Sequence, residues 1–286
     1  MKLIIILLCL GLERSLNLSQ YLFRFNWFNA YANKMREWGS KLKVTEGYVG
    51  VAWLLLPLLI AFGILCAILC LIGGVVMGWL LSLLVLIYCL GPQSFYQRVK
   101  AYFAEANTNQ PEAAEKNLKA LMPTSEEKDL GFRSVTKLIM FLFNQSIFAV
   151  LFWFIVLGPW GALLYRVIAL INEYADQENH KASSMAKPAQ FFLDLLDWIP
   201  VRILGLIYCL VGNFAPTFNY WVSQLLTGVS KTHEIGIDSA LKALHVSEDE
   251  SAADLKENQE AFALTDRTLI VYLVILALVC LGSIIS

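Results

Sequence analysis

Charged side chains inside or beside apolar runs are the residues of this sequence that point to a site. Arg166 and Glu173 lie in one largely apolar stretch, and Asp194, Asp197 and Arg202 lie in the next one. A charge at bilayer depth is unfavourable and by default marks a functional or paired position. Guanidinium and carboxylate groups gathered in one place can bind an anion, or they can pair with one another.

Helical spacing predicts which of these charges share a face. Arg166 and Glu173 are seven residues apart, and Asp194 and Asp197 are three apart, so each pair lies on one face of a helix. Pro200 suits the first position of a helix, and Asp197 suits the cap region before it. We therefore expect a new helix to begin at Pro200.

Two interpretations of these residues stay open. In the first, the arginines line a binding site for an anion or a lipid head group where broken helices meet. In the second, an internal ion-pair network pins the helices and binds no ligand. We expect both arginines to face the protein interior, with at least one paired to a carboxylate of the set. The candidate ligand-binding set is Arg166, Arg202, Glu173, Asp194, Asp197, Tyr165 and Asn172.

The usual signatures of soluble enzymes are absent from the sequence. It contains no HExxH, GxSxG or GxxxxGK[ST] motif, and its 6 cysteines lie in apolar runs without a CxxC pair. Cys66 and Cys70 could touch on one helix face, but two thiols alone make a poor metal site. The 3 histidines are scattered along the chain. We expect no catalytic residue, no metal and no cofactor.

The composition assigns the chain to a membrane. Of its 286 residues, 58% are apolar and only 16% are charged, against about 45–50% and 25% in an average soluble domain. These values exclude a soluble globular enzyme, a disordered protein and a disulfide-rich secreted domain. The net charge of −1 gives no argument for nucleic-acid binding.

The hydropathy pattern predicts an all-α, polytopic membrane helical bundle with broken or re-entrant helices and cytoplasmic helical segments. Residues 158–161 (Gly-Pro-Trp-Gly) form either a re-entrant turn or the loop of a helical hairpin. The expected segments are N-terminal membrane and interfacial helices (1–47), a transmembrane hairpin broken at Gly73-Gly74 (48–90), a cytoplasmic helical segment (91–137), a membrane core with broken helices (138–228), an acidic soluble segment (229–268) and a C-terminal transmembrane helix (269–286).

The distribution of basic residues predicts the topology. Residues 13–47 and 91–137 flank the hairpin and are rich in Lys and Arg, which places both in the cytoplasm.

The two soluble stretches are expected to differ in structure. Within the first one, helices are expected over 94–106, over 111–122 and after Pro123. Residues 247–260 are rich in Ser, Glu and Asp, and we expect a mobile linker there because they cannot bury enough surface to offset chain entropy.

Three segments carry a resemblance to known membrane proteins. Residues 158–166 (Gly-Pro-Trp-Gly-Ala-Leu-Leu-Tyr-Arg) and 196–205 (Leu-Asp-Trp-Ile-Pro-Val-Arg-Ile-Leu-Gly) resemble motifs of the CobD/CbiB membrane proteins of cobalamin biosynthesis. Residues 193–202, the Phe152-Trp153 pair and the chain length are more similar still to the AmpE family of inner-membrane proteins, which is tied to β-lactamase induction. The resemblance covers essentially the whole chain.

The resemblance implies a function, and the polar motif residues that this sequence lacks argue against catalysis. The polar run that follows the Tyr-Arg pair in CobD/CbiB enzymes falls here on Ala169, Leu170, Asn172 and Tyr174, so most of its polar groups are missing. The resemblance therefore implies a non-catalytic regulatory protein linked to β-lactamase induction or muropeptide stress sensing. The alternative is a membrane enzyme, related to the cobalamin amide synthases, that acts on an amphipathic substrate. A small-solute transporter has little support.

The expected location is the bacterial inner membrane, crossed several times. The expected partners are membrane lipids, a signalling protein in the cytoplasm or the membrane, and a small anionic ligand bound at Arg166 and Arg202. No nucleic acid is expected.

Overall fold

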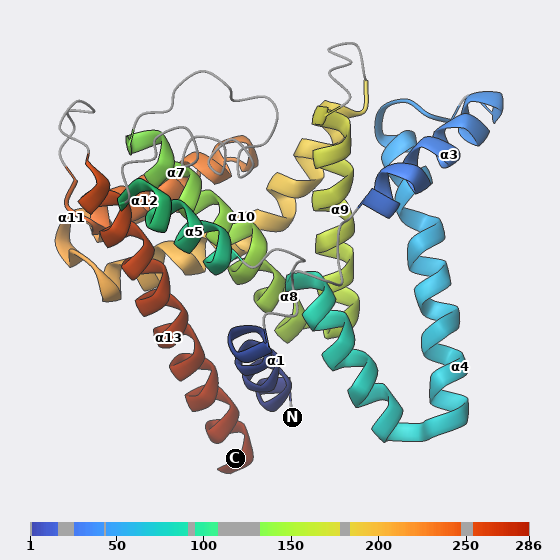
Figure 1. Ribbon diagram of the computed structural model, residues 1–286, viewed down its shortest axis with the longest axis horizontal. Coiled ribbons are helices and arrows are strands. Elements are labelled where there is room, and N and C mark those ends of the chain that lie inside the picture. Colours follow the sequence, from blue (N-terminus) through green and yellow to red (C-terminus); the bar gives the residue numbers. More distant parts are fainter. Residues whose placement is uncertain are drawn as a thin grey trace. The chain divides into compact units, whose positions relative to one another are not determined.

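The computed structural model describes residues 2–16, 26–42, 44–90, 95–107, 132–177, 184–246 and 254–285. Every regular element within these ranges is a helix (Figure 1). Three of the described helical stretches are long and apolar enough to cross a membrane, namely Gly47–Leu69, Phe132–Leu157 and Leu255–Gly282. Lys2–Leu12 and Val76–Leu90 are shorter apolar helices. The prediction of an all-helical fold of the membrane type is confirmed.

The chain divides into two compact units. The first unit comprises Met1–Ser94 and Val150–Leu193, and the second comprises Phe95–Ala149 and Asp194–Ser286. Helix α10 (Ala186–Val211) contributes residues to both units.

The core of the first unit forms where three helices contact one another. Helix α4 (Gly47–Leu90) contacts α1 (Lys2–Leu16), α3 (Asn26–Leu42) and α9 (Pro159–Gln177). The apolar faces of α3 and α9 follow from spacings of three and four residues, whereas α4 is apolar on all sides. Buried members of the core are Phe28 and Ala32 from α3, Val51 and Leu54 from α4, and Val167, Leu170, Ile171 and Tyr174 from α9. Helix α3 thus lies within the segment 1–47, where interfacial helices are expected.

Two glycines make the breaks between the helices of this unit. Gly74 has φ 56° and ψ −145°, and α4 bends sharply there (Figure 1), as the Gly73-Gly74 pair predicts. Gly158 has φ 70° and separates α8 (Ala149–Leu157) from α9, which begins at Pro159. Glycine tolerates positive φ without the steric strain of a side chain, and proline suits the first position of the next helix. The predicted break at 158–161 is thus a one-residue turn.

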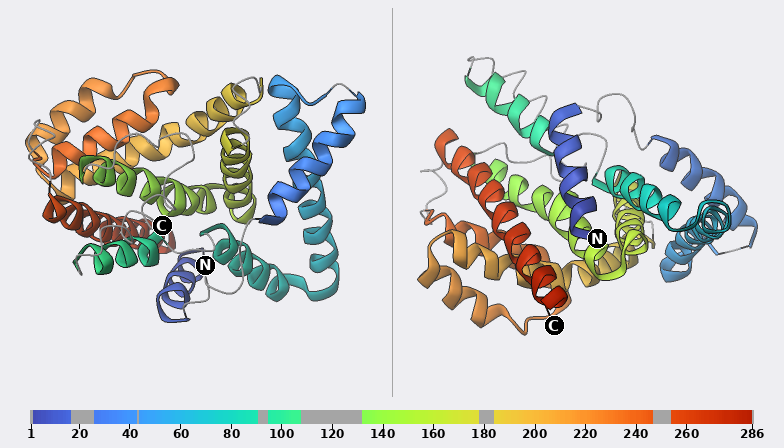
Figure 2. Two further views of the ribbon diagram at one scale, coloured as in Figure 1. Left: turned by 45° about the horizontal axis from the view of Figure 1, so that its top comes forward. Right: turned by 90° about the horizontal axis from the view of Figure 1, so that it is seen from below.

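The second unit gathers the remaining helices around α7 (Phe132–Phe143). Helix α7 contacts α5 (Phe95–Asn107), α12 (Thr232–Ala243) and α13 (Leu255–Ile285), and α12 contacts α11 (Phe214–Gln224). Figure 2 shows these helices from two further sides. A short 3-10 helix, η2 (Val229–Lys231), precedes α12, and a π-helical turn, η1 (Asn144–Phe148), follows α7.

Polar contacts pair α7 with α13. Arg133 Nε lies 2.9 Å from Glu257 Oε1, and Thr136 Oγ1 donates a hydrogen bond to Asn258 Oδ1 at 2.8 Å. The amide of Asn258 in turn donates to the hydroxyl of Tyr102 on α5 at 3.2 Å. These contacts lie within buried surface, so they set the register of the three helices as well as holding them together.

Two local predictions are wrong. Helix α10 runs unbroken through Pro200, so no new helix begins there and Asp197 is an interior residue of α10 and not a cap. A proline inside a helix removes one backbone hydrogen bond and crowds the preceding turn. Burial of the neighbouring Val201 and Leu204 offsets this loss. Tertiary packing thus overrides a local stop signal.

The second error concerns the expected linker at 247–260. Residues 255–260 form the first turns of α13, which therefore begins well before the expected 269. Asp254 Oδ1 accepts a hydrogen bond from the backbone N–H of Glu257 at 2.8 Å, which is a helix N-cap. Residues 247–253 lie outside the described residues, as do the helices expected over 111–122 and after Pro123. The helix expected over 94–106 is confirmed as α5.

Candidate functional site

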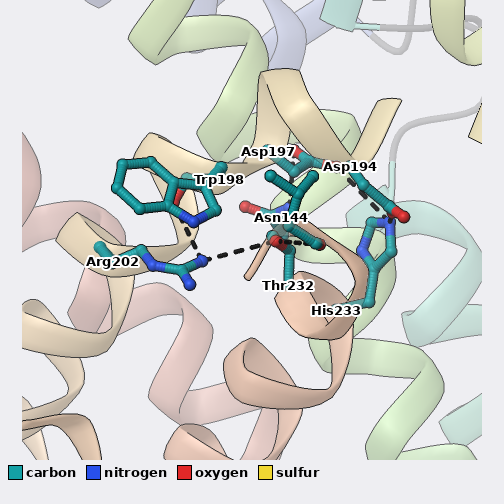
Figure 3. Close-up of polar contacts among 8 residues, drawn as sticks. Asn144, Asp194, Asp197, Trp198, Arg202, Thr232 and His233 are labelled. Carbon is teal, nitrogen blue, oxygen red and sulfur yellow. Dashed lines mark hydrogen bonds and ion pairs between the residues drawn. The ribbon is translucent and has the colours of Figure 1, made fainter. Parts of the chain in front are cut away.

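Four polar side chains of the second unit meet in its interior, and we call them the acid–histidine cluster. They are Asp194 and Asp197 of α10, His233 of α12 and Asn144 of η1 (Figure 3). His233 Nε2 lies 2.9 Å from Asp194 Oδ1 and 3.8 Å from Asp197 Oδ2. Asn144 Nδ2 donates a hydrogen bond to Asp197 Oδ1 at 3.1 Å.

The cluster is largely shielded from solvent. The side chain of Asp197 is 0% exposed, that of Asp194 is 11% exposed, and that of His233 is 19% exposed. A buried carboxylate is strongly unfavourable unless it is paired and hydrogen-bonded. His233 and Asn144 supply those interactions. The ring of Phe141 packs against the imidazole of His233 in an edge-to-face arrangement, with ring centroids 5.1 Å apart.

Local helix geometry explains how these groups reach one another. The i, i+3 spacing places Asp194 and Asp197 on one face of α10, as predicted. Asn144 opens the π-helical turn inside the apolar stretch Phe132–Leu157. Such single turns occur frequently at functional sites because the extra residue redirects a side chain. Here the amide is directed to a buried carboxylate.

The pKa of His233 is set by two opposing influences within the cluster. Burial alone lowers the pKa of His233, but the hydrogen bond to Asp194 and the negative charges of Asp197 and Asp194 outweigh burial. The net effect raises the pKa of His233 above its usual value, so the imidazolium form is favoured. The cluster can therefore hold or release a proton while it joins α12 to α10.

This pKa shift predicts that stability depends on pH. Because the pKa of His233 is raised in the folded state, its stabilising contribution is complete below about 6.5, the unfolded value, and is lost as the pH rises through the folded pKa. We expect the unfolding temperature of detergent-purified protein to fall as the pH rises from about 6.5 through the folded-state pKa of His233. The fall should be smaller in His233→Gln. The exposed His245 provides a control, since His245→Asn should keep the fall. Equal pH slopes for wild type and His233→Gln would contradict the assignment.

Arg202 lies beside the cluster and is bound mainly to backbone oxygens. Its guanidinium donates hydrogen bonds to the carbonyl of Thr227 at 2.8 Å, to the carbonyl of Trp198 at 3.3 Å and, more weakly, to the Leu225 carbonyl at 3.5 Å. It also contacts Thr232 Oγ1 at 3.4 Å and lies 4.6 Å from the ring centre of Trp198 (Figure 3).

The sequence predicts a carboxylate as a partner of Arg202 or Arg166, but Arg202 binds backbone carbonyls instead. It is buried, as predicted, with 6% of its surface exposed. Within the described ranges it forms no ion pair, so the ionic partner of Asp194 and Asp197 is His233 and not Arg202. Arg202 instead holds the segment between α11 and α12 against α10.

The remaining predicted residues belong to the first unit. Tyr165 of α9 is fully buried, Arg166 and Asn172 are partly buried, and Glu173 is exposed. The negative charge of Glu173 acts on Arg166, in agreement with the predicted shared face. The structure thus brings Asp194, Asp197 and Arg202 together around α10 and α12, and places Arg166, Glu173, Tyr165 and Asn172 on α9.

Sequence reasoning missed two members of the cluster. His233 stood as one of three scattered histidines, and no local spacing connects it to Asp194. Asn144 offered a clearer signal, since it is a polar residue inside an apolar stretch of membrane-spanning length. In the described part of the chain, no three His, Cys, Asp or Glu side chains lie so as to hold a metal ion.

A helical fold with membrane-length apolar helices and an acid–histidine cluster beside one of them defines a polytopic membrane protein. A family model described as regulatory signalling modulator protein AmpE matches residues 1–285. The chain therefore belongs to the AmpE family, a family of membrane proteins, and the resemblance of its motifs to that family is confirmed.

The similar proteins separate into full-length and partial relatives. Protein AmpE of Shigella flexneri is 23% identical over 97% of both chains. The cobalamin biosynthesis protein CobD of Chromobacterium violaceum is 34% identical over 30% of this chain and 28% of its own length. CobD of Stutzerimonas stutzeri is 26% identical over 51% of this chain and 50% of its own length. The chain thus spans half or less of these two CobD proteins. No solved structure matches.

Proposed function

We propose that this protein is a non-catalytic modulator of signalling in the bacterial inner membrane, where it acts in β-lactamase induction or in the response to muropeptide stress. The observation that carries the proposal is the match to the AmpE family over residues 1–285. The 97% coverage of Shigella flexneri AmpE supports it, because the match extends over all of the expected segments.

The acid–histidine cluster supports a regulatory role in physical terms. Asn144 lies in an apolar stretch of spanning length, whereas His233 lies on the amphipathic helix α12. Asp197 contacts both. A change in the membrane-spanning helix would therefore shift α12, whose outer surface carries charged residues such as Glu234. In this proposal α12 transmits the state of the membrane helix to a signalling partner in the cytoplasm or the membrane, and a small anionic ligand sets that state.

The proposal is tested by deleting the gene in its host and measuring induction of β-lactamase with a β-lactam. We expect deletion to change induction several-fold, and wild-type protein to restore it. His233→Gln should restore it only in part, with membrane abundance confirmed by immunoblot. The control is Lys256→Gln, an exposed change on α13 outside the cluster and outside α12. If deletion and wild type induce β-lactamase equally, the proposed function is wrong.

A second candidate is a membrane enzyme related to the cobalamin amide synthases. The partial matches to CobD favour it, and a paired aspartate and histidine can transfer a proton. Expression in a strain that lacks CobD separates the two candidates. Growth without added cobalamin would favour the enzyme, whereas the regulatory proposal predicts no growth.

A further inference from the structure

The second unit contains a helical hairpin without charged residues. Between Arg202 and Lys231 the sequence includes no Asp, Glu, Lys, Arg or His. Residues 203–227, which we call the uncharged hairpin, comprise the second half of α10, a turn and helix α11. Arg202 closes its base by donating to the Thr227 carbonyl at 2.8 Å, and Trp221 of α11 donates to the Arg202 carbonyl at 2.8 Å. The two arms are therefore held together.

One face of the uncharged hairpin is apolar and exposed. Leu206 and Leu210 of α10 are 40% and 60% exposed, and Phe214 and Val222 of α11 are 54% and 49% exposed. Spacings of four and eight residues place each pair on one face of its helix. The other side of α10 is packed, since Tyr208 is fully buried. An exposed apolar face of this kind marks a surface for interaction with an apolar partner.

Neither arm of the uncharged hairpin is long enough to cross a bilayer. Helix α11 has 11 residues, which corresponds to about 16 Å of helix against about 30 Å of hydrocarbon. The arm of α10 from Ile203 to Val211 is shorter still. In a membrane, the hairpin must therefore either lie flat in the interface or dip part of the way into the bilayer.

Helix α12 decides between these two orientations, because it follows the hairpin from base to tip. Its first residue, Thr232, contacts Arg202 at 3.4 Å, and the Ala243 carbonyl accepts a hydrogen bond from the backbone N–H of Asn213 at 2.9 Å. A tip that dipped into the hydrocarbon would take the neighbouring Lys242 with it, and a charge at that depth is unfavourable. Base and tip therefore belong at one depth.

Helix α12 also covers the side of α11 that faces away from the apolar surface. The Tyr220 hydroxyl donates a hydrogen bond to Asp238 Oδ2 of α12 at 2.9 Å. Tyr220 and Val222 are two residues apart, so they point about 200° apart around the helix. The hairpin and α12 thus form a layer with one apolar side and one charged side, which is the pattern of an interfacial element.

We propose that the uncharged hairpin lies flat in the membrane interface, with its exposed apolar face against lipid acyl chains and α12 toward water. Lipid is the partner because α12 contacts α7, which packs on α13, and the stretch Leu255–Gly282 of α13 is long and apolar enough to cross a membrane. Trp198 and Trp221 contact Arg202 at the base of the hairpin, and tryptophan is enriched at membrane interfaces. This placement does not depend on a role in β-lactamase induction.

The test is photo-crosslinking of the full chain in liposomes of palmitoyl-oleoyl-phosphatidylcholine. The photoreactive residue p-benzoylphenylalanine, which inserts into nearby C–H bonds, replaces Leu210, Phe214 or Val222 one at a time. All three positions are exposed and can accept a larger side chain. We expect lipid adducts, measured by mass spectrometry, in yields similar to those from Leu278 of the spanning helix α13. The exposed Glu234 of α12 is the control and should give no lipid adduct.

The position of attachment on the acyl chain measures the depth of each residue. Ile203 and Leu210 are seven residues apart, which is about 10 Å along the axis of α10. A flat hairpin should attach both to acyl carbons at the same depth, within about 5–10 Å of the head groups. A dipping hairpin would place Leu210 deeper than Ile203 by most of that separation.

Three results would overturn the proposal. Adduct yields at Leu210, Phe214 and Val222 as low as at Glu234 would show that this face does not meet lipid. Cross-linked dimers in place of lipid adducts would assign the face to a second copy of the chain. Attachment of Leu210 near the bilayer centre, with Ile203 near the head groups, would show a hairpin that dips.

Discussion

Replacing His233 with glutamine should lower the free energy of unfolding by about 3 kcal/mol at pH 6, measured by denaturant unfolding in detergent. Removing one partner of a buried ion pair typically costs about 3–5 kcal/mol, because the other charge is left without compensation. The lower end applies here because Asp194 and His233 keep 11% and 19% of their side-chain surface exposed. Asp194 contributes most to the loss, since it lies 2.9 Å from His233 Nε2, against 3.8 Å for Asp197.

A double variant separates the charge effect from the loss of packing. Asp194→Asn/His233→Gln removes the stranded negative charge together with its partner, so it should be more stable than His233→Gln alone. The control is Glu234→Gln, the exposed neighbour on α12, which should change stability by less than about 0.5 kcal/mol. If the double variant is merely additive, the attraction between His233 and Asp194 contributes little to stability.

Replacing Arg202 with alanine should have a comparable effect through a different mechanism. The change removes the donors to the carbonyls of Thr227, Trp198 and Leu225 and the contact with the Trp198 ring. Hydrogen bonds from a charged group contribute about 1.5–3 kcal/mol, and buried carbonyls left without a donor add a desolvation penalty. We expect a loss of about 3 kcal/mol and faster hydrogen exchange across residues 225–231.

Two comparisons show whether backbone oxygens are the true partners of Arg202. Arg202→Lys keeps the charge but not the planar fork, so it should restore less than half of the loss. Lys231→Ala, an exposed basic residue in the same segment, should leave exchange unchanged. Rescue of Arg202→Ala by Asp197→Asn would contradict our description, because it would make the arginine an ionic partner of that carboxylate.

The class of fold was predictable because its causes are local. A surplus of apolar residues in long uninterrupted stretches leaves few alternatives to membrane helices, since only helices and closed barrels satisfy every backbone polar group inside a bilayer. The breaks at Gly74 and Gly158 were predictable for the same reason. Both residues have positive φ, a backbone conformation that glycine adopts more readily than other residues. The shared face of Asp194 and Asp197 followed from helical period alone.

What the sequence left undecided depends on contacts between distant residues. The stop signal at Pro200 was overridden because burial of its neighbours outweighs one lost hydrogen bond. The early start of α13 depends on Asp254 as a cap and on the pairing of Glu257 with Arg133 from a helix far away in the chain.

The partner of the buried aspartates shows the same limit most clearly. The sequence determined that these carboxylates needed partners, because a charge buried without one is too unfavourable. Arg202 is the cation nearest to Asp197 along the chain, yet Arg202 binds carbonyls and His233 of α12 pairs with Asp194. Only the packing of α12 against its neighbours could decide this, since helical period relates residues within one helix and gives no information about which helices meet.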